Sequence, residues 1–250
     1  MRAPSPAELL NVWEDGLSST STRRALSLLA AMSPGASWEA LAALSIGRRD
    51  RELLRLRQTL WGPRMAAIAA CPACRERLEL TLDIRELLSS ADPASAVDPA
   101  EVGEICLTLE DCSVAFRLPT TEDVLAAEGE ESAGAARSLI LDRCLLSAQR
   151  GGAAVRATQL PAPVVESIAE AMAQADPLAD IQLKIDCPSC RHRWRAAFDI
   201  VSFLWTELEA WAGRTLAEVH TLATAYGWRE ADILALSATR RQFYLEMVGA

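Results

Sequence analysis

The sequence predicts an α+β protein that is mainly helical and contains a small β-ribbon split into two halves. Three observations support this prediction. Two Cys-Pro-x-Cys motifs stand 116 positions apart, the residues beside each motif alternate between apolar and polar as in β-strands, and helical periodicity dominates most of the remaining sequence. The segment between the motifs is long and acidic and contains a predicted β-hairpin.

The two motifs begin at Cys71 and Cys187, and each places two thiols on either side of a two-residue spacer. Zinc prefers four thiolate ligands at about 2.3 Å, and such a spacer lets one tight turn present two of them. One motif supplies only two ligands, so neither closes a site alone. The sequence therefore predicts one structural zinc ion per chain, held jointly by four residues: Cys71, Cys74, Cys187 and Cys190.

The similarity between the two halves extends beyond the cysteines. A shift of 116 positions superimposes residues 71–88 on residues 187–204, and identical residues then coincide at Arg75/Arg191, Arg77/Arg193, Asp83/Asp199, Ile84/Ile200 and Leu88/Leu204. Apolar residues alternate with polar ones after the first motif (Leu78, Leu80, Leu82) and before the second (Ile181, Leu183, Ile185). Each half is therefore predicted to form a strand, a knuckle and a second strand.

Two other interpretations of the motifs stay open, namely redox pairs and disulfides. A thioredoxin-like motif opens a helix after a strand, whereas both motifs here lead into strand-like sequence, which favours zinc. The position after the second cysteine is commonly glycine, which adopts positive φ without strain, but here it is Arg75 or Arg191. With Arg77 and Arg193, these arginines either offset the charge of a four-thiolate zinc centre or are solvated charges. His192 is a weaker candidate ligand in place of one cysteine.

Composition sets the broad class of the protein. Half of the residues are hydrophobic, which excludes a chain disordered throughout. Seven cysteines, an odd number, and no signal-peptide pattern predict a cytoplasmic location. The longest apolar region, residues 26–46, is broken by Ser33-Pro34-Gly35, so we expect two helices there and no membrane span. The remaining cysteines are expected to be ordinary buried thiols: Cys106, Cys112 and Cys144.

Negative charge is concentrated between the motifs. Residues 89–135 contain eleven acidic residues and one arginine, for a net charge of −10, whereas the whole chain carries −9. A strongly acidic surface repels phosphate backbones. Nucleic acid is therefore disfavoured as the main partner.

The chain is expected to form one integrated fold with five parts. These are an N-terminal helical region (1–64), a first zinc knuckle (65–88), an acidic α+β insertion (89–180), a second zinc knuckle (181–204) and a C-terminal helical region (205–250).

Four helices are predicted in the N-terminal region. Ser5, Pro6 and Glu8 form the start of the first helix, with Ser5 as N-cap and Glu8 at the capping-box position. The last of the four, residues 48–61, carries five arginines: Arg48, Arg49, Arg51, Arg55 and Arg57. We expect them to lie largely on solvated faces, with nucleic-acid binding as the alternative.

The insertion is predicted to begin with a linker, residues 89–100, that is rich in Ala, Asp, Ser and Pro. A hairpin of residues 105–109 and 114–118 follows, and Pro119 leads into a capped helix. A longer helix is expected over residues 133–148, ended by Gly151-Gly152, and a further one over residues 163–173.

After residue 200 the sequence is helical to its end. We expect Gly213 to interrupt the first helix, and His220 to be a packing residue on an apolar face. Ser237 is placed to cap a last helix that carries Phe243, Tyr244 and Met247, which we expect to serve as core or partner surface.

No catalytic constellation is visible, so we expect a protein that is not an enzyme. The chain has two histidines and lacks a glycine-rich phosphate loop, a Gly-x-Ser-x-Gly motif and a His-Glu-x-x-His motif. Four cysteines also close the zinc coordination sphere, whereas a catalytic zinc needs an open position.

Several short segments, together with the cysteine motifs, resemble a known family. They are Leu9-Leu10-Asn11-Val12-Trp13-Glu14, Arg24-Ala25-Leu26-Ser27-Leu28-Leu29, Gly47-Arg48-Arg49-Asp50-Arg51, Phe116-Arg117-Leu118-Pro119-Thr120-Thr121 and Asp232-Ile233-Leu234-Ala235-Leu236 with Arg240-Arg241. The chain is similar to zinc-ribbon proteins of phage-tail-like contractile injection systems, and to baseplate hub assembly proteins of T-even-type phages. The resemblance implies a non-enzymatic assembly factor or component, with baseplate hub or spike proteins as partners.

Two other function classes stay open at this point. A nucleic-acid-binding zinc ribbon would use the basic and aromatic residues of the second knuckle, Arg191, Arg193, Trp194 and Arg195. A thiol oxidoreductase would instead use a reactive cysteine pair. The oligomeric state is not predicted.

Overall fold

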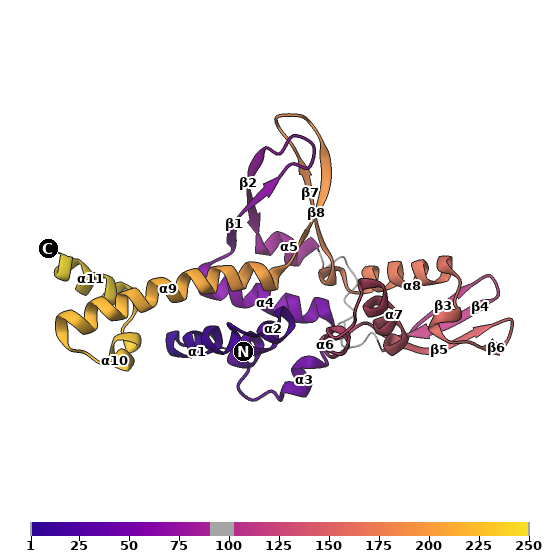
Figure 1. Ribbon diagram of the computed structural model, residues 1–250, viewed down its shortest axis with the longest axis horizontal. Coiled ribbons are helices and arrows are strands. Elements are labelled where there is room, and N and C mark those ends of the chain that lie inside the picture. Colours follow the sequence, from indigo (N-terminus) through magenta and orange to yellow (C-terminus); the bar gives the residue numbers. More distant parts are fainter. Residues whose placement is uncertain (1, 91–102, 250) are drawn as a thin grey trace. The chain divides into compact units, whose positions relative to one another are not determined.

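The computed structural model describes residues 2–90 and 103–249 (Figure 1). The chain separates into two compact units. The terminal unit joins residues 1–36 to residues 201–250, and the central unit contains residues 37–200. The five-part division expected from the sequence stays a prediction, and residues 91–100 of the expected linker lie outside the described residues.

The terminal unit is built from helices of both chain ends: α1 (Pro6–Gly16), α2 (Ser21–Met32), most of α9 (Ile200–Tyr226), α10 (Glu230–Ala235) and α11 (Ala238–Gly249). The predicted capping box of α1 is confirmed, because the Glu8 N–H donates to Ser5 Oγ and the Ser5 N–H donates to the Glu8 carboxylate. Ser237 also caps α11 as predicted, by accepting from the Arg240 N–H at 3.2 Å.

The terminal unit has its own apolar core. Its buried residues come from α1, α9 and α10: Leu10, Ala212, Val219, Leu222, Ile233 and Leu234. The end of α1 fits against the ring of Trp205, because a Cβ added to Gly16 would lie 2.2 Å from the ring. Arg24 lies over the same ring, 4.3 Å from its centroid.

The expected break at Gly213 is wrong, because Gly213 lies inside α9, which is 27 residues long. Figure 1 shows α9 as one continuous helix. Relative to alanine, a glycine inside a helix costs about 0.5–1 kcal/mol. Leu208, Ala212, Val219 and Leu222 on either side are buried, and this packing outweighs the local cost. His220, expected to pack, is exposed on this helix.

The central unit contains these elements: α3 (Trp38–Ala42), α4 (Ile46–Trp61), β1 (Arg64–Ala70), β2 (Arg77–Asp83), α5 (Ile84–Ser90), β3 (Ile105–Leu109), β4 (Cys112–Phe116), α6 (Thr121–Ala127), α7 (Ala133–Cys144), β5 (Leu145–Arg150), β6 (Ala153–Ala154), η1 (Ala157–Gln159), α8 (Ala162–Ala175), η2 (Pro177–Ala179), β7 (Ile181–Asp186) and β8 (Arg193–Phe198).

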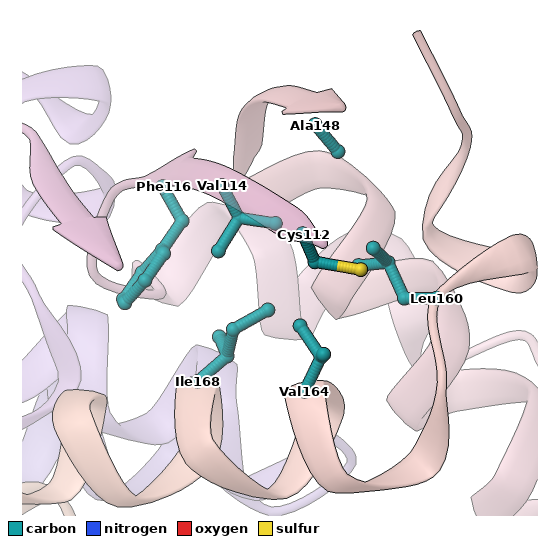
Figure 2. Packing of buried hydrophobic residues seen from close by; sticks show 7 residues of the cluster. All are labelled: Cys112, Val114, Phe116, Ala148, Leu160, Val164 and Ile168. Atoms are coloured by element: carbon teal, nitrogen blue, oxygen red, sulfur yellow. The ribbon is translucent and has the colours of Figure 1, made fainter. Parts of the chain in front are cut away.

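The insertion forms a four-stranded antiparallel sheet of order β3-β4-β5-β6, against which α8 packs. The predicted hairpin forms the first two strands, but its second strand is Cys112–Phe116 and not residues 114–118. Figure 2 shows the apolar side chains of the sheet facing α8, where Val164 and Ile168 meet Val114 and Phe116. This cluster is the core of the insertion.

The helix expected over residues 133–148 ends earlier, at Cys144. Residues 145–150 instead pair with β4 as strand β5, and Gly151-Gly152 form the turn to β6. Helical propensity in this stretch is overridden because β4 offers it a free edge with backbone hydrogen-bonding groups.

Two further expectations about side chains hold only in part, because Arg55 is exposed as expected but two other arginines of α4 are not. Arg49 and Arg57 of α4 are buried, at 8% and 4% exposure, and do not lie on a solvated face. Cys106 is exposed, whereas Cys112 and Cys144 are buried as expected. Among the residues that the structure describes, no helix is long and apolar enough to cross a membrane.

Candidate metal centre

The four motif cysteines lie together in the central unit. Their sulfur atoms are all within 4.8 Å of one another, and two pairs that join the two motifs, Cys71 with Cys190 and Cys74 with Cys187, are each 3.6 Å apart. Tetrahedral zinc with bonds of about 2.3 Å separates its sulfur ligands by about 3.8 Å. The four cysteines can therefore hold one tetrahedral metal ion.

Both knuckles have the same backbone structure. In the first, the Arg75 N–H donates to the Cys71 carbonyl and the Cys71 N–H donates to the Glu76 carbonyl. In the second, the Arg191 and Cys187 N–H groups donate in the same way, to the carbonyls of Cys187 and His192. The repeat seen in the sequence is thus a repeat of turn geometry.

The residue that follows each motif has a left-handed backbone, with φ of 66° at Arg75 and 59° at Arg191. This is the conformation that glycine adopts without strain and that an arginine adopts at a cost. Positive φ was expected at this position, because glycine is common after the second cysteine of such motifs. The structure keeps the left-handed turn even with a side chain present.

The sulfur atoms affect each other's ionisation. Burial opposes ionisation of Cys71, yet hydrogen bonds from the backbone N–H groups of Cys74 and Ala73 lower its pKa to about 7. At Cys74 the backbone N–H of Glu76 favours the thiolate, but the sulfur of Cys190, burial and the sulfur of Cys187 raise the pKa to about 12. Four adjacent thiolates repel one another. A metal ion bound between them would offset this repulsion and favour the deprotonated form of all four cysteines.

The two hairpins that carry the knuckles share a small core. Strand β1 pairs with β2, and β7 pairs with β8, both antiparallel and ending at the knuckles. Cys71 and Cys187 are buried with Leu78 and Ile185, and Trp194 packs against this cluster. His192 stacks on Trp194 and is not part of the group of sulfur ligands. The split ribbon therefore packs its two hairpins around the sulfur cluster.

Each half of the ribbon ends in the same way. Asp83 and Asp199 stand immediately before a helix, and Ile84 and Ile200, which follow them, are fully buried. Asp83 accepts a hydrogen bond from the Arg85 N–H at 2.9 Å, as a helix N-cap does. The repeated Asp-Ile pair thus stands where each half of the ribbon passes into a helix.

Helix α4 makes hydrogen bonds near the start of each half of the ribbon. At its carboxyl end, Arg57 donates to the carbonyls of Gly62 and Arg64, at 2.5 and 2.6 Å, where β1 begins. At its amino end, the Gly47 N–H donates to Asp176 Oδ2 at 2.8 Å, shortly before β7. Sequence reasoning missed these residues, because a buried arginine on a basic helix has no distinct periodic signal.

A second polar network lies in the insertion, around the fully buried Asp123. Its carboxylate accepts hydrogen bonds from Arg117 and Arg143, at 2.6, 2.9 and 2.7 Å, and from the N–H and hydroxyl of Thr120. Burial opposes ionisation, but these donors hold the pKa of Asp123 well below its usual range. The segment Phe116 to Thr121, noted in the sequence, therefore contains structural contacts around α6.

Comparison with family models gives one match. Residues 27–205, more than half of the chain, match the family described as T4 bacteriophage base plate protein. The chain belongs to this family. Comparison with curated proteins and with solved structures found no significant match. The base plate family match includes both knuckles, α4 and the insertion.

Membership of the base plate family supports a structural role in a phage baseplate. The geometry of the sulfur cluster also bears on the redox alternative, because sulfur atoms of different knuckles lie 3.6 Å apart and each motif is followed by a strand. A redox pair would be formed within one motif at the start of a helix.

Proposed function

We propose that the protein is a non-enzymatic assembly factor or component of the baseplate hub in a phage-like contractile injection system. Its membership of the base plate family is the observation that carries this proposal. The role would depend on protein–protein contacts, and one zinc ion, bound by Cys71, Cys74, Cys187 and Cys190, would serve as a structural staple.

The charge of the insertion supports a basic protein as the partner. In residues 103–135 the exposed carboxylates come from Glu104, Glu110, Asp111, Glu122, Glu128, Glu130 and Glu131. Charged surfaces of this kind select partners and speed their association more than they raise affinity. A basic face on a hub or spike protein fits such a surface.

Deletion of the gene tests the proposed role. In the deletion strain, sheath and tube proteins should be made in normal amounts while complete baseplates are absent, because an assembly factor acts after synthesis. The wild-type gene should restore particles, and a gene with Cys71→Ser and Cys187→Ser should not. Normal, functional particles in the deletion strain would contradict the proposal. Mass spectrometry of purified wild-type particles distinguishes a retained component from a transient factor.

The proposed binding of a basic partner by the carboxylates of the insertion can be tested separately. Glu130 and Glu131 are exposed, and no other described residue forms an ion pair with them. A Glu130→Gln, Glu131→Gln double variant should bind the purified hub or spike protein more weakly, and its binding should depend less on salt. Unchanged affinity and unchanged salt dependence would place the contact elsewhere.

A further inference from the structure

Strand β1 carries a row of exposed apolar side chains. Ala66, Ile68 and Ala70 lie on the outer face of the β1–β2 hairpin, and Ile68 is 61% exposed. The alternate residues of the strand, such as Ala69, face the core that the two hairpins share. Arg64, at the start of β1, is the one charged residue of the strand. The rest of its outer row therefore carries no charge.

The backbone groups of the same three residues point away from β2. The Cys71 N–H donates to the Glu76 carbonyl, so the residues of β1 with odd numbers exchange hydrogen bonds with β2. The N–H and C=O groups of residues 66, 68 and 70 then point to the other side of the strand. They form no hydrogen bond with any described residue. We call these three residues the β1 edge.

The second half of the ribbon provides an internal comparison. A shift of 116 positions places the β1 edge on three exposed polar residues of β7: Gln182, Lys184 and Asp186. Strands β2 and β8 also carry exposed charges on their outer rows: Arg77, Glu79, Arg193 and Arg195. Charged side chains on an edge strand hinder pairing with another chain. Among the four ribbon strands, β1 alone lacks this protection along its outer row.

The apolar stretch of β1 reads the same in both directions: Ala66-Ala67-Ile68-Ala69-Ala70. Two copies can therefore pair antiparallel about a two-fold axis at Ile68, with Ala66 opposite the second copy's Ala70. In this register the outward N–H and C=O groups of one β1 edge meet those of the other, and each gains a hydrogen-bond partner. The strand is thus complementary to itself in both sequence and hydrogen bonding.

We propose that the β1 edge is a self-association surface, at which two copies of the chain join β1 to β1 in one four-stranded sheet. The outer face of the hairpin is balanced in charge, because Arg64 stands opposite Asp83 and Arg77 lies two residues from Glu79. The two copies of Arg64 would lie about 27 Å apart along the strands. Nothing on this face selects an acidic or a basic partner, and the palindromic stretch favours a second copy.

The net charge of the chain does not prevent this pairing. Residues 89–135 carry −10 of the total charge of −9, so the rest of the chain, which includes β1, sums to +1. Repulsion between the acidic segments of two copies is screened beyond about 8–10 Å at physiological salt. Added salt should therefore leave the dimer intact or strengthen it.

The proposed pairing stops at two copies. The outer strands of the four-stranded sheet would be the two copies of β2, whose exposed Arg77 and Glu79 hinder further addition. The interface is isologous and small, so we expect a reversible dimer and not a fibre. This inference does not depend on the proposed hub role.

The first test gives the β1 edge the residue that the repeat has at the same place. Ile68→Lys puts two like charges opposite each other on the two-fold axis. Analytical ultracentrifugation should show a dimer of the wild type at about 100 μM, and dimerisation should weaken at least about tenfold in the variant. Its thermal midpoint, measured at low concentration, should change by less than about 2 °C because Ile68 is exposed.

The matched control adds the same charge to the neighbouring strand. Thr81 is exposed on the outer face of β2, directly opposite Ala66, but it does not lie on the β1 edge. Thr81→Lys should therefore dimerise as the wild type does. Equal weakening in this control would reduce the effect to added charge and overturn the proposal.

Cysteine cross-linking tests the register. In the metal-loaded chain with Cys106→Ser, which removes an exposed thiol, Ile68→Cys should form a disulfide between copies. The two Cα atoms of a hydrogen-bonded antiparallel pair lie about 5.5 Å apart, within the range of a disulfide. Ala66→Cys should not cross-link, since its counterpart would lie about 14 Å away along the strand. Equal cross-linking of both variants would overturn the two-fold pairing.

Three other results would overturn the proposal. The first is a wild-type monomer at about 100 μM, and the second is a dimer that Ile68→Lys leaves unchanged. The third is a dimer that moderate salt dissociates, because it would be held by charges. A monomer whose Ile68→Lys variant loses binding to the purified hub or spike protein would assign the β1 edge to that protein instead.

Discussion

Each knuckle contributes one buried and one exposed cysteine. Cys71 and Cys187 are 1% and 2% exposed and belong to the apolar cluster of the ribbon, whereas Cys74 and Cys190 are exposed. The buried thiols therefore have two roles, as candidate ligands and as packing residues. The exposed thiols contribute little packing, so their effect on stability should depend on metal binding.

Substitution of one ligand in each knuckle should have similar effects if the site is shared. Cys71→Ser and Cys187→Ser should each lower the free energy of unfolding by about 3 kcal/mol or more and abolish stoichiometric zinc binding. Cys106→Ser is the control, because this thiol is exposed and outside the cluster, and it should change stability by less than about 0.5 kcal/mol. Chemical unfolding and metal analysis of the three variants provide the measurement. Equal losses in all three would be inconsistent with a shared site.

Asp123 gives a prediction that depends on pH. Asp123→Asn should cost about 2–4 kcal/mol at pH 7, since it weakens the pairing of Arg117 and Arg143 with a buried carboxylate. The two arginines are about one-third exposed, which limits the cost. Because the folded-state pKa lies below the unfolded value, this stability is present above about pH 5 and lost progressively as the pH falls below 4.

The measurement is urea unfolding of wild type and variant between pH 3 and pH 7. Glu122→Gln is the matched control, because Glu122 contacts the same Arg143 at 3.4 Å but is 66% exposed. This control should lose less than about 0.5 kcal/mol. A cost for Asp123→Asn that does not vary with pH would contradict the assignment to the ionised carboxylate.

At the scale of elements, helix α4 positions the two halves of the ribbon. Its sixteen residues span about 24 Å, with Arg57 holding the start of β1 and the amino end tied to the segment before β7. The two halves of the sulfur cluster are far apart in sequence, so their alignment depends on this helix as well as on the metal. A change at the amino end of α4 should therefore reach the metal centre.

Two helical glycines allow this dependence to be tested. At Gly47 an added Cβ would lie 1.9 Å from Asp176 Oδ1 and 2.9 Å from the Ala179 nitrogen, so Gly47→Ala should destabilise by about 2 kcal/mol or more and weaken zinc binding. At Gly213 no described atom lies within 4 Å of the added Cβ, so Gly213→Ala should stabilise by about 0.5–1 kcal/mol. Thermal unfolding and competition with a zinc chelator measure both effects. Stabilisation by Gly47→Ala would show that the close approach of Gly47 to Asp176 is not required for the fold.

At the scale of the molecule, the metal is expected to join parts of the chain that are distant in sequence. A structural metal binds the folded protein alone, so its binding free energy adds to stability and makes the thermal midpoint depend on free metal concentration. The buried core of the ribbon has only four residues within the described part of the chain, and two of them are the candidate ligands Cys71 and Cys187, which makes this contribution important for the ribbon.

The purified chain should contain one zinc ion. Native mass spectrometry should show a single metal per chain, and a strong chelator should lower the thermal midpoint, with recovery when zinc is added back. The Cys71→Ser variant, which lacks a ligand, should not respond to the chelator. Two metals per chain, or none after gentle purification, would contradict the shared centre.

The sequence by itself determined those features that depend on residues close together in the chain. The capping box of Ser5 and Glu8, the cap at Ser237, the alternation beside both motifs and the repeat of the knuckles all depend on neighbouring residues, and the structure confirms each. The proximity of the four cysteines was also predictable, because two half-sites of two thiols imply one complete site.

Only the tertiary structure decided the features that depend on distant residues. Strand β5 forms where a helix was expected because β4 supplies its hydrogen-bond partner. Helix α9 passes through Gly213 because packing on both sides outweighs the intrinsic cost of glycine. Arg57 and Gly47 serve the ribbon through contacts with a strand start and with a residue 129 positions away. Local propensities differ by about 1 kcal/mol per residue, so long-range packing and hydrogen bonds override them wherever they compete.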